Sequence, residues 1–454
     1  MDCFLWPLLL MCYRLMLNSL KHRIIGLLVF VEGKGFFDLL LVNFLTQFLG
    51  FGSILLVAKF LTPVELGEVK ILQSYTAIFV IWAGFGFNAA VLKVCAENRP
   101  DPVKAGILRL AVSRAGIATT ITLLLVIILA LNGVTTSSSH LSLWLIVMAC
   151  SIPLQVLTGI FIVFLQAQKK IKEMARSQAI VKVQSVGLIV VSTWLWGFKG
   201  FIFATVAAYA LGLWPFLRQI GLKFLTTPLE QKPAHFMQYA FFSVLANGVS
   251  QLGQYGDVFI LDHFSANREA IGYYSLALIF ITAASQVTGT VQSITTPYFS
   301  EHAQDKVWFR RQLILNQGRM ALLSVAVAIG VYIFAAILVP LFYGPDYAST
   351  LIYLAILLIK YVIWSSCAVI GVSLLGLGLM RYNFVVVAIT TPIGLTLSYL
   401  FLRQFGVIGV AWAQVGVSIA QFLLVLGAIR LAMQRAFGIV THEQQDGFVA
   451  VRIE

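Results

Sequence analysis

Charged residues are scarce in this sequence. Only 11% of its 454 residues are Asp, Glu, Lys or Arg, whereas 60% are hydrophobic, and the mean hydropathy is +0.92. A soluble domain carries about 25% charged residues, so this composition excludes a soluble globular protein. The 31 Lys and Arg outnumber the 18 Asp and Glu, which leaves a formal net charge of +13. In so apolar a chain, this excess indicates membrane topology rather than binding to nucleic acid.

Cysteine and catalytic motifs are also sparse. The five cysteines are Cys3, Cys12, Cys95, Cys150 and Cys367. Their spacing fits neither a disulfide framework nor a zinc site. The sequence has no Walker-type phosphate-binding loop, and no loop is long or acidic enough for the active site of a membrane glycosyltransferase or polymerase. We therefore expect no cofactor, no metal and no enzymatic activity.

Long apolar runs make up most of the chain. Each reaches the roughly 20 residues that a helix needs to cross about 30 Å of hydrocarbon. None alternates like a barrel strand, so the predicted fold is an all-α polytopic membrane protein. We predict twelve transmembrane helices, at residues 36–60, 70–92, 107–131, 142–166, 178–197, 200–217, 237–262, 272–297, 320–342, 350–378, 382–402 and 406–430.

The loops between these spans alternate in charge. The termini and the loops on their side hold 25 of the 31 Lys and Arg, and the opposite loops hold five, including Lys70. Lys360 is then the one cation assigned to neither side, because it lies near the middle of a span. The bias places both termini in the cytoplasm.

The sequence of residues 42–67 is similar to that of residues 246–272, which indicates an internal repeat. At an offset of 204 positions, Asn43 matches Asn247 and Gln47 matches Gln251; one extra residue then brings Gly67 onto Gly272. So long a period indicates duplication of a half-protein, as in many secondary transporters.

The predicted organisation has five parts. They are a cytoplasmic or interfacial lead-in (1–35, with Met16 an alternative start), an N-terminal six-helix bundle (36–222), a cytoplasmic linker (223–236), a C-terminal six-helix bundle (237–430) and a cytoplasmic tail (431–454).

Two local patterns predict helix boundaries. Thr62 can cap a helix whose first position is Pro63, with Glu65 reaching back as a capping box. Gly197 and Gly406 each begin a Gly-x-x-Gly pattern where a tight hairpin is expected between two spans.

Several short motifs occur in a familiar order. They are Leu-Thr-Pro-x-Glu-x-Gly at 61–67, Gly-Phe-Gly-Phe-Asn-Ala-Ala-Val-Leu-Lys at 84–93, Asp257 with Gly272-Tyr273-Tyr274, and Tyr343-Gly344-x-Asp346-Tyr347. Over residues 36–430 the chain resembles the polysaccharide repeat-unit flippases of the O-antigen type. These belong to the multidrug/oligosaccharidyl-lipid/polysaccharide exporter superfamily.

The resemblance implies a fold and an activity. The fold is two six-helix bundles around a central cavity, like that of the multidrug and toxin extruders. The activity is translocation of an undecaprenyl-diphosphate-linked oligosaccharide across the bacterial inner membrane. The implied partners are this lipid-linked substrate, membrane lipids, a polysaccharide polymerase and a chain-length regulator, with no nucleic acid.

Amide side chains recur at helical spacing inside three predicted spans. They are Asn43 and Gln47 in the first span, Asn247, Gln251 and Gln254 in the seventh, and Gln286 in the eighth. Amides are costly against lipid, so they contact either neighbouring helices or a wet cavity. Because both halves carry them, we favour a polar lumen between the halves, where amides suit sugar hydroxyls.

Three cations lie inside spans or near their ends. Lys360 is near the middle of the tenth span, where a cation costs about 2.5–3.5 kcal/mol, so it must face a cavity or an ion-pair partner. Arg114 and Lys182 lie one or two turns inside the third and fifth spans. They either extend to lipid headgroups or line the path of an anionic diphosphate. All three are candidate substrate-binding residues.

Two carboxylates, Asp257 and Asp262, lie near the outer end of the seventh span. They either form ion pairs or bind the protons or sodium ions that drive transport. The alternative function, a cation-coupled multidrug exporter of the same fold, needs carboxylates inside the cavity. Its candidates, Asp38 and Asp257, lie toward the two mouths, and the midplane charge of Lys360 is positive. This favours an anionic substrate and the flippase.

Overall fold

Helices make up every regular element of the computed structural model. The structure describes residues 49–97, 100–221, 224, 226–228, 236–265, 267–302, 304–377 and 379–438. The first half contains a helix at Leu49–Phe60 followed by α3 (Pro63–Gly84), α4 (Phe87–Ala96), α5 (Asp101–Leu131), α6 (Ser139–Ala149), α7 (Ile152–Ala167) and α8 (Ile171–Ile220). The second half contains α9 (Phe236–Phe264), α10 (Arg268–Glu301), α11 (Lys306–Leu338), a π-helical turn η2 (Val339–Tyr343), a short η3 (Pro345–Tyr347), α12 (Thr350–Ser366), α13 (Ala368–Gly376) and α14 (Met380–Gly438).

Within the described residues, seven helical segments are long and apolar enough to cross a membrane, or eight if the bent pair α3 and α4 is one span. Two of them, α8 and α14, contain 50 and 59 residues. At about 1.5 Å per residue, each is more than twice as long as the hydrocarbon core is thick. We count α8 and α14 as two spans each and the bent pair as one span. With α9 and the helix at Leu49–Phe60 added, the total is consistent with the twelve predicted spans.

Both long helices reverse direction at a glycine. Gly197 and Gly406 have φ values of +57° and +67° with extended ψ values, a conformation that side chains other than glycine rarely adopt. A Cβ at Gly200 would meet the carbonyl oxygen of Ser192, eight residues earlier. A Cβ at Gly409 would likewise meet the carbonyl oxygen of Phe401, also eight residues earlier. These contacts arise only in a hairpin, so the predicted hairpins are confirmed.

The start of α3 is fixed by the predicted capping box. The backbone N–H of Thr62 donates to Glu65 Oε2 at 2.9 Å, and the N–H of Glu65 donates to Thr62 Oγ1 at 3.3 Å. This cap begins the helix at Pro63, seven residues before the predicted span. The prediction that Lys70 lies in an outer loop was therefore wrong, because Lys70 lies two turns inside α3.

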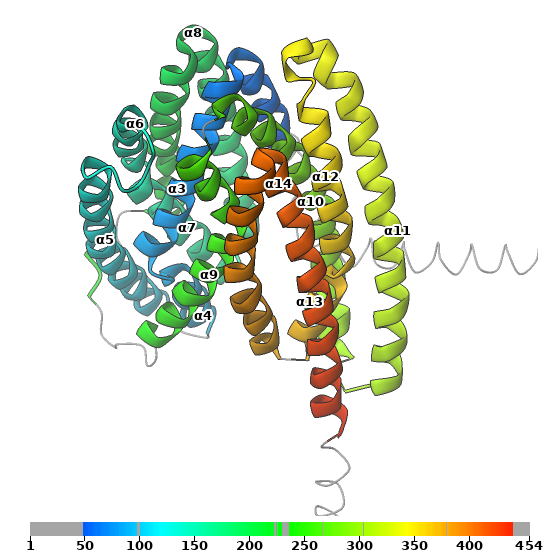
Figure 1. Cartoon of the computed structure of the whole chain (residues 1–454). Helices are drawn as coiled ribbons and strands as arrows, with labels where there is room; N and C mark the ends of the chain where they lie inside the picture. Colours follow the sequence, from blue (N-terminus) through cyan, green and yellow to red (C-terminus); the bar gives the residue numbers. More distant parts are fainter. Residues whose placement is uncertain are drawn as a thin grey trace, which may run out of the picture.

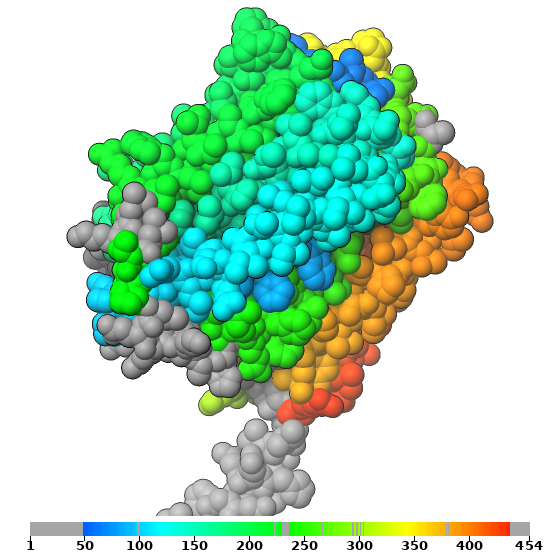
Figure 2. All heavy atoms as spheres, turned by 90° about the vertical axis from the view of Figure 1, so that its left-hand side faces the viewer, coloured from blue at the N-terminus to red at the C-terminus, as the bar shows by residue number. Residues whose placement is uncertain are grey.

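Apolar side chains cover the surface that faces away from the other helices. Figure 2 shows α5 (cyan) running across one face of the molecule. Its exposed side chains include Ile117, Ile121, Leu124, Leu125 and Ile128, each more than 45% exposed. A soluble protein does not expose such a contiguous patch, so this face is in contact with lipid.

The two halves meet along α3. The helices of the first half, α5 to α8, lie to the left in Figure 1, and α10 to α13 lie to the right. Across this division α3 packs against both α9 and α10, and α4 packs against α9. At one end of the contact, Gly67 lies against Gly272, the glycine that matches it in the repeat. At the other end the rings of Phe87 and Phe236 stack with centroids 5.9 Å apart.

Candidate functional site

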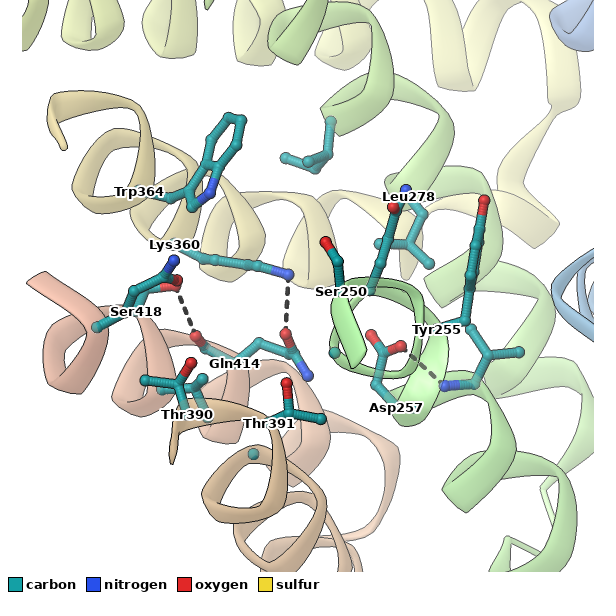
Figure 3. Close-up of a pocket in the computed structure, with 18 of the residues that line it drawn as sticks. Ser250, Tyr255, Asp257, Leu278, Lys360, Trp364, Thr390, Thr391, Gln414 and Ser418 are labelled. Atoms are coloured by element: carbon teal, nitrogen blue, oxygen red, sulfur yellow. Dashed lines mark hydrogen bonds between the residues drawn. The ribbon is translucent and has the colours of Figure 1, made fainter. Parts of the chain in front are cut away.

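A cavity of about 490 Å³ lies among α9, α10, α12 and α14. Figure 3 shows side chains from three of these helices pointing into it: Tyr255 and Asp257 from α9, Lys360 and Trp364 from α12, and Gln414 from α14. Its volume is in the range of small-molecule binding sites. The cavity belongs mainly to the second half, whereas a lumen shared by both halves was expected.

Lys360 enters the cavity from the middle of α12. It lies about 15 Å along the helix from Thr350, at 1.5 Å per residue. Its ammonium donates a hydrogen bond of 2.8 Å to Gln414 Oε1 on α14. The partner is thus a neutral amide, which does not itself compensate the positive charge. An ammonium has three donors, so Lys360 retains hydrogen-bonding capacity for a ligand.

Asp257 is the acidic residue of the cavity. Its side chain is 3% exposed and accepts hydrogen bonds from the hydroxyl of Tyr274 and from the N–H of Val258. The carboxylate lines the same cavity as Lys70 and Lys360, and opposite charges in one cavity attract each other. Asp257 therefore lies inside the cavity, deeper than its predicted place toward the outer mouth.

Lys70 is the charged cavity residue that the sequence analysis missed. Among the described lining residues, it alone comes from the first half. Its ammonium lies 5.6 Å from the centroid of the Tyr255 ring, within the range of a cation–π contact. The sequence did contain a signal for this position. The capping box at Thr62 predicts a helix that begins at Pro63 and therefore includes Lys70, whereas hydropathy placed Lys70 at the edge of a span.

The remaining lining combines amides, hydroxyls and aromatic rings. Gln254 and Gln286, both predicted site residues, line the cavity, and so does Trp364. The other hydroxyl and amide groups of the lining include those of Ser250, Thr282, Ser285, Thr390, Thr391, Ser418 and Gln421. Such groups donate and accept hydrogen bonds, and an indole ring offers an apolar face to a sugar ring. The lining is therefore suited to a polyhydroxylated ligand that carries negative charge.

Other predicted site residues lie elsewhere. Arg114 is exposed on α5, Asn247 is exposed on α9 and bonds Ser243 at 3.1 Å, and neither lines the cavity. Gln251 is on α9, and its Oε1 is buried without a described hydrogen-bond partner. The ammonium of Lys182 lies against Gly50 in the first half. The predicted residues Asn43 and Gln47, and Asp38, lie outside the described residues.

Asp262 belongs to a separate polar cluster at the end of α9. Its fully buried carboxylate pairs with Arg268 at 2.9 Å and accepts a hydrogen bond of 2.9 Å from Ser137. Ser137 lies in the loop between α5 and α6, so the cluster joins the two halves. Beside it, the His263 ring contacts the Val134 carbonyl at 3.2 Å and the Tyr75 hydroxyl at 3.4 Å.

Comparison with known families shows the family of this chain. A family model described as polysaccharide biosynthesis protein matches residues 33–303, more than half of the chain. The chain belongs to the polysaccharide biosynthesis protein family. No curated protein matches this family member. Among the residues that the structure describes, no group of three or more His, Cys, Asp or Glu is placed to hold a metal ion.

Solved structures show the fold of this polysaccharide biosynthesis family member. The lipid II flippase MurJ in an inward closed conformation is 16% identical, with a TM-score of 0.72 over 88% of this chain and 90% of that one. An inward-facing multidrug resistance MATE family transporter of the MOP superfamily is 13% identical, with a TM-score of 0.71 over 87% and 96%. A MOP superfamily transporter from Pyrococcus furiosus, described as having a binding pocket of reverse polarity, is 14% identical, with a TM-score of 0.61 over 88% and 93%. The protein is an all-α, multi-pass membrane protein that shares its fold with these flippases and transporters.

Proposed function

We propose that this protein is a flippase for an undecaprenyl-diphosphate-linked oligosaccharide repeat unit. It would move this unit across the bacterial inner membrane, with both termini in the cytoplasm, for the synthesis of O-antigen, capsule or exopolysaccharide. A polymerase and a chain-length regulator would act on the delivered unit. The family supports this function because its model is described as polysaccharide biosynthesis, and the fold supports it because a lipid II flippase shares it.

The observation that carries the proposal is the charge of the cavity. Lys70 and Lys360 both line it, and within the described residues neither forms an ion pair with a carboxylate. Asp257 is hydrogen-bonded by Tyr274 and Val258. Two cations and one carboxylate leave a net positive charge in the cavity, and such a charge is stabilised by an anionic ligand. A lipid diphosphate or an acidic sugar supplies that anion.

Substitution of Lys360 tests the flippase proposal. Lys360→Ala should abolish surface polysaccharide in a strain that lacks its own transporter, because the cavity loses half of its positive charge. Lys360→Arg keeps the charge but changes its shape and hydration, so it should restore polysaccharide in part. The measurement is complementation, scored as surface polysaccharide, together with a blot for membrane abundance.

Lys199→Ala is the matched control, because Lys199 is exposed next to the Gly197 hairpin and does not line the cavity. It should complement like the unaltered protein. Normal transport by Lys360→Ala at normal abundance would contradict the role of the cavity charge. Loss of Lys360→Ala from the membrane would show instead that Lys360 stabilises the fold through Gln414.

A second candidate, the cation-coupled multidrug exporter, is favoured by one observation. Asp257 is a buried carboxylate in the cavity, as such an exporter requires. Asp257 is accordingly our candidate for binding a coupling ion in either function, whereas the ion pair with Arg268 makes Asp262 the weaker candidate. Expression in a drug-sensitive strain separates the two functions. An exporter raises drug tolerance and loses this effect in Asp257→Asn, while a flippase restores polysaccharide and leaves drug tolerance unchanged.

A further inference from the structure

The ring of His263 lies where the two halves meet at the C-terminal end of α9. Its Nε2 atom is 3.2 Å from the carbonyl oxygen of Val134, in the loop between α5 and α6. Its Nδ1 atom is 3.4 Å from the hydroxyl oxygen of Tyr75 on α3. Both partners belong to the first half, whereas His263 belongs to the second. The ring therefore connects the halves through both of its nitrogen atoms.

Both nitrogen atoms of the ring face groups that accept hydrogen bonds. A carbonyl oxygen can only accept, so the contact with Val134 requires a proton on Nε2, and a neutral ring then has no proton on Nδ1. Around Nδ1 lie the carbonyl oxygen of Phe259 at 3.3 Å, the Tyr75 hydroxyl and Asp262 Oδ2 at 3.9 Å. Of these three groups, only the hydroxyl can donate to a neutral ring, whereas all three can accept from a protonated one. The surroundings therefore suit a ring that carries a proton on both nitrogen atoms.

Charge also favours the protonated ring. The carboxylate of Asp262 is fully buried, and the hydrogen bonds from Arg268 and Ser137 both go to its Oδ1. Its Oδ2 is the oxygen that faces the His263 ring. Hydrogen bonds from a charged donor are about twice as strong as those between neutral groups. Protonation therefore strengthens the bond from His263 to Val134 of the first half.

Solvent protons can reach this ring. The side chain of His263 is 35% exposed, and histidine is the side chain that ordinarily changes charge near neutral pH. The other charged or titratable groups at this end of the surrounding elements are Glu65 and Glu68 on α3, His140 on α6, Arg268 and Glu269 on α10, and Tyr399 and Arg403 on α14. None of these forms a described hydrogen bond or ion pair with the ring. A change of pH near neutrality therefore acts on this contact through His263.

We propose that His263 is a proton-binding site that holds the two halves together at this end of the molecule, as a proton lock. The bound proton favours the packing described here, because two of its acceptors, Val134 and Tyr75, belong to the half that moves away when the contact opens. Loss of the proton weakens the contact, so the halves part more readily. The predicted topology places this end outside the membrane, so an acidic exterior favours the closed contact. The proton lock does not depend on which substrate the protein carries.

Distances between spin labels on the two halves test the proton lock. The labels are attached to Leu131→Cys at the end of α5 and to Gln404→Cys beside the Gly406 hairpin, both exposed, in a background with all five native cysteines replaced. Pulsed electron spin resonance is recorded on the purified full chain in lipid nanodiscs, at about pH 5.5 and about pH 8, near the limits of the range in which histidine titrates. Both faces of a nanodisc contact the same buffer, so the orientation of the chain does not affect the result. The ratio of short to long distances should fall about tenfold at the higher pH, which corresponds to about 1.4 kcal/mol.

Three variants identify the group that binds the proton. His263→Gln should remove the pH dependence, because glutamine can donate to Val134 but does not titrate in this range. His263→Lys keeps a positive charge at both pH values, so the short distance should prevail at both. His140→Gln is the matched control, since His140 lies at the same end of the molecule but accepts a hydrogen bond of 3.1 Å from Trp144 on its own helix. It should leave the pH dependence intact.

Three results would overturn the proton lock. The first is a distance distribution of the unaltered protein that does not change with pH, and the second is an undiminished pH dependence in His263→Gln. The third is loss of the pH dependence in His140→Gln alone, which would assign the proton to His140. If His263→Gln fails to fold, His263→Lys decides the question, because a pH dependence equal to that of the unaltered protein contradicts the lock.

Discussion

At the scale of residues, two carboxylates on the same helix have different surroundings. Asp257 faces a cavity with two cations nearby. Asp262, five residues on, is fully buried and paired with Arg268, which also bonds Ser137 of the other half. Asp257 is thus available to a ligand or an ion, whereas Asp262 is part of the contact between the halves.

Removal of Arg268 should destabilise the protein. Arg268→Ala leaves the buried charge of Asp262 without its cation, and breaking such a pair costs about 3–5 kcal/mol. We expect a lower temperature of unfolding for the purified protein and reduced membrane abundance. The matched control is Arg403→Ala, since the exposed Arg403 contacts only the ring of Tyr399 at 5.4 Å among the interactions that the structure describes. Adding Asp262→Ala to Arg268→Ala should recover part of the lost stability. An unchanged unfolding temperature in Arg268→Ala would contradict the role of the ion pair.

At the scale of elements, α3 and α10 approach each other closely across the division between the halves. A Cβ added at Gly272 would lie 1.8 Å from the carbonyl oxygen of Pro63, and one added at Gly67 would lie 3.1 Å from the backbone nitrogen of Gly272. Neither backbone can yield without moving its helix. The matched glycines of the repeat therefore allow the two helices to pack closely.

Gly272→Ala should separate α3 from α10. We expect lower unfolding temperature and reduced polysaccharide transport, because the added methyl group displaces helix backbone. Gly289→Ala on the same helix is the control, since a Cβ there has no neighbour within 4 Å. Alanine favours a helix by about 1 kcal/mol over glycine, so this control should be neutral or more stable. Equal effects of the two substitutions would show that the Gly67–Gly272 contact is not close in solution.

At the scale of the whole molecule, α10 is long enough to extend from one membrane surface to the other. Its first residue, Arg268, contacts Ser137, and its last, Glu301, lies 33 residues further along, about 50 Å at 1.5 Å per residue. Ser137 and Glu301 are therefore at opposite ends of the molecule. The distribution of Lys and Arg predicts that the Ser137 end faces outward.

Reporter fusions test this topology. A fusion after Ser137 should report the outer side of the membrane, and a fusion after Glu301 should report the cytoplasm. The physical reason is the retention of cationic loops on the cytoplasmic side. Activity of an alkaline phosphatase and of a fluorescent reporter at each position provides the measurement. Both fusions on one side would overturn the topology, and an exchange of sides would invert the orientation of the whole chain.

Local physics made most of the fold predictable. Hydropathy identified the apolar helices because the backbone must satisfy its own hydrogen bonds in lipid. The box at Thr62 and the hairpins at Gly197 and Gly406 were predictable because each depends on a few neighbouring residues. The position of Lys70 was missed because mean hydropathy locates the centre of a span better than its first residue.

The candidate site was predictable only in part. The sequence alone determined that Lys360 is a cation within a span, since its chain neighbours already set that environment. Only the tertiary structure decided that Gln414, from a helix 54 residues further along the chain, is its partner, and that Lys70 enters the same cavity. It likewise decided that Gln254 faces this cavity while Asn247 and Arg114 do not. The reason is that helical periodicity relates side chains on one helix, whereas the face turned to a cavity depends on packing between helices that are distant in sequence.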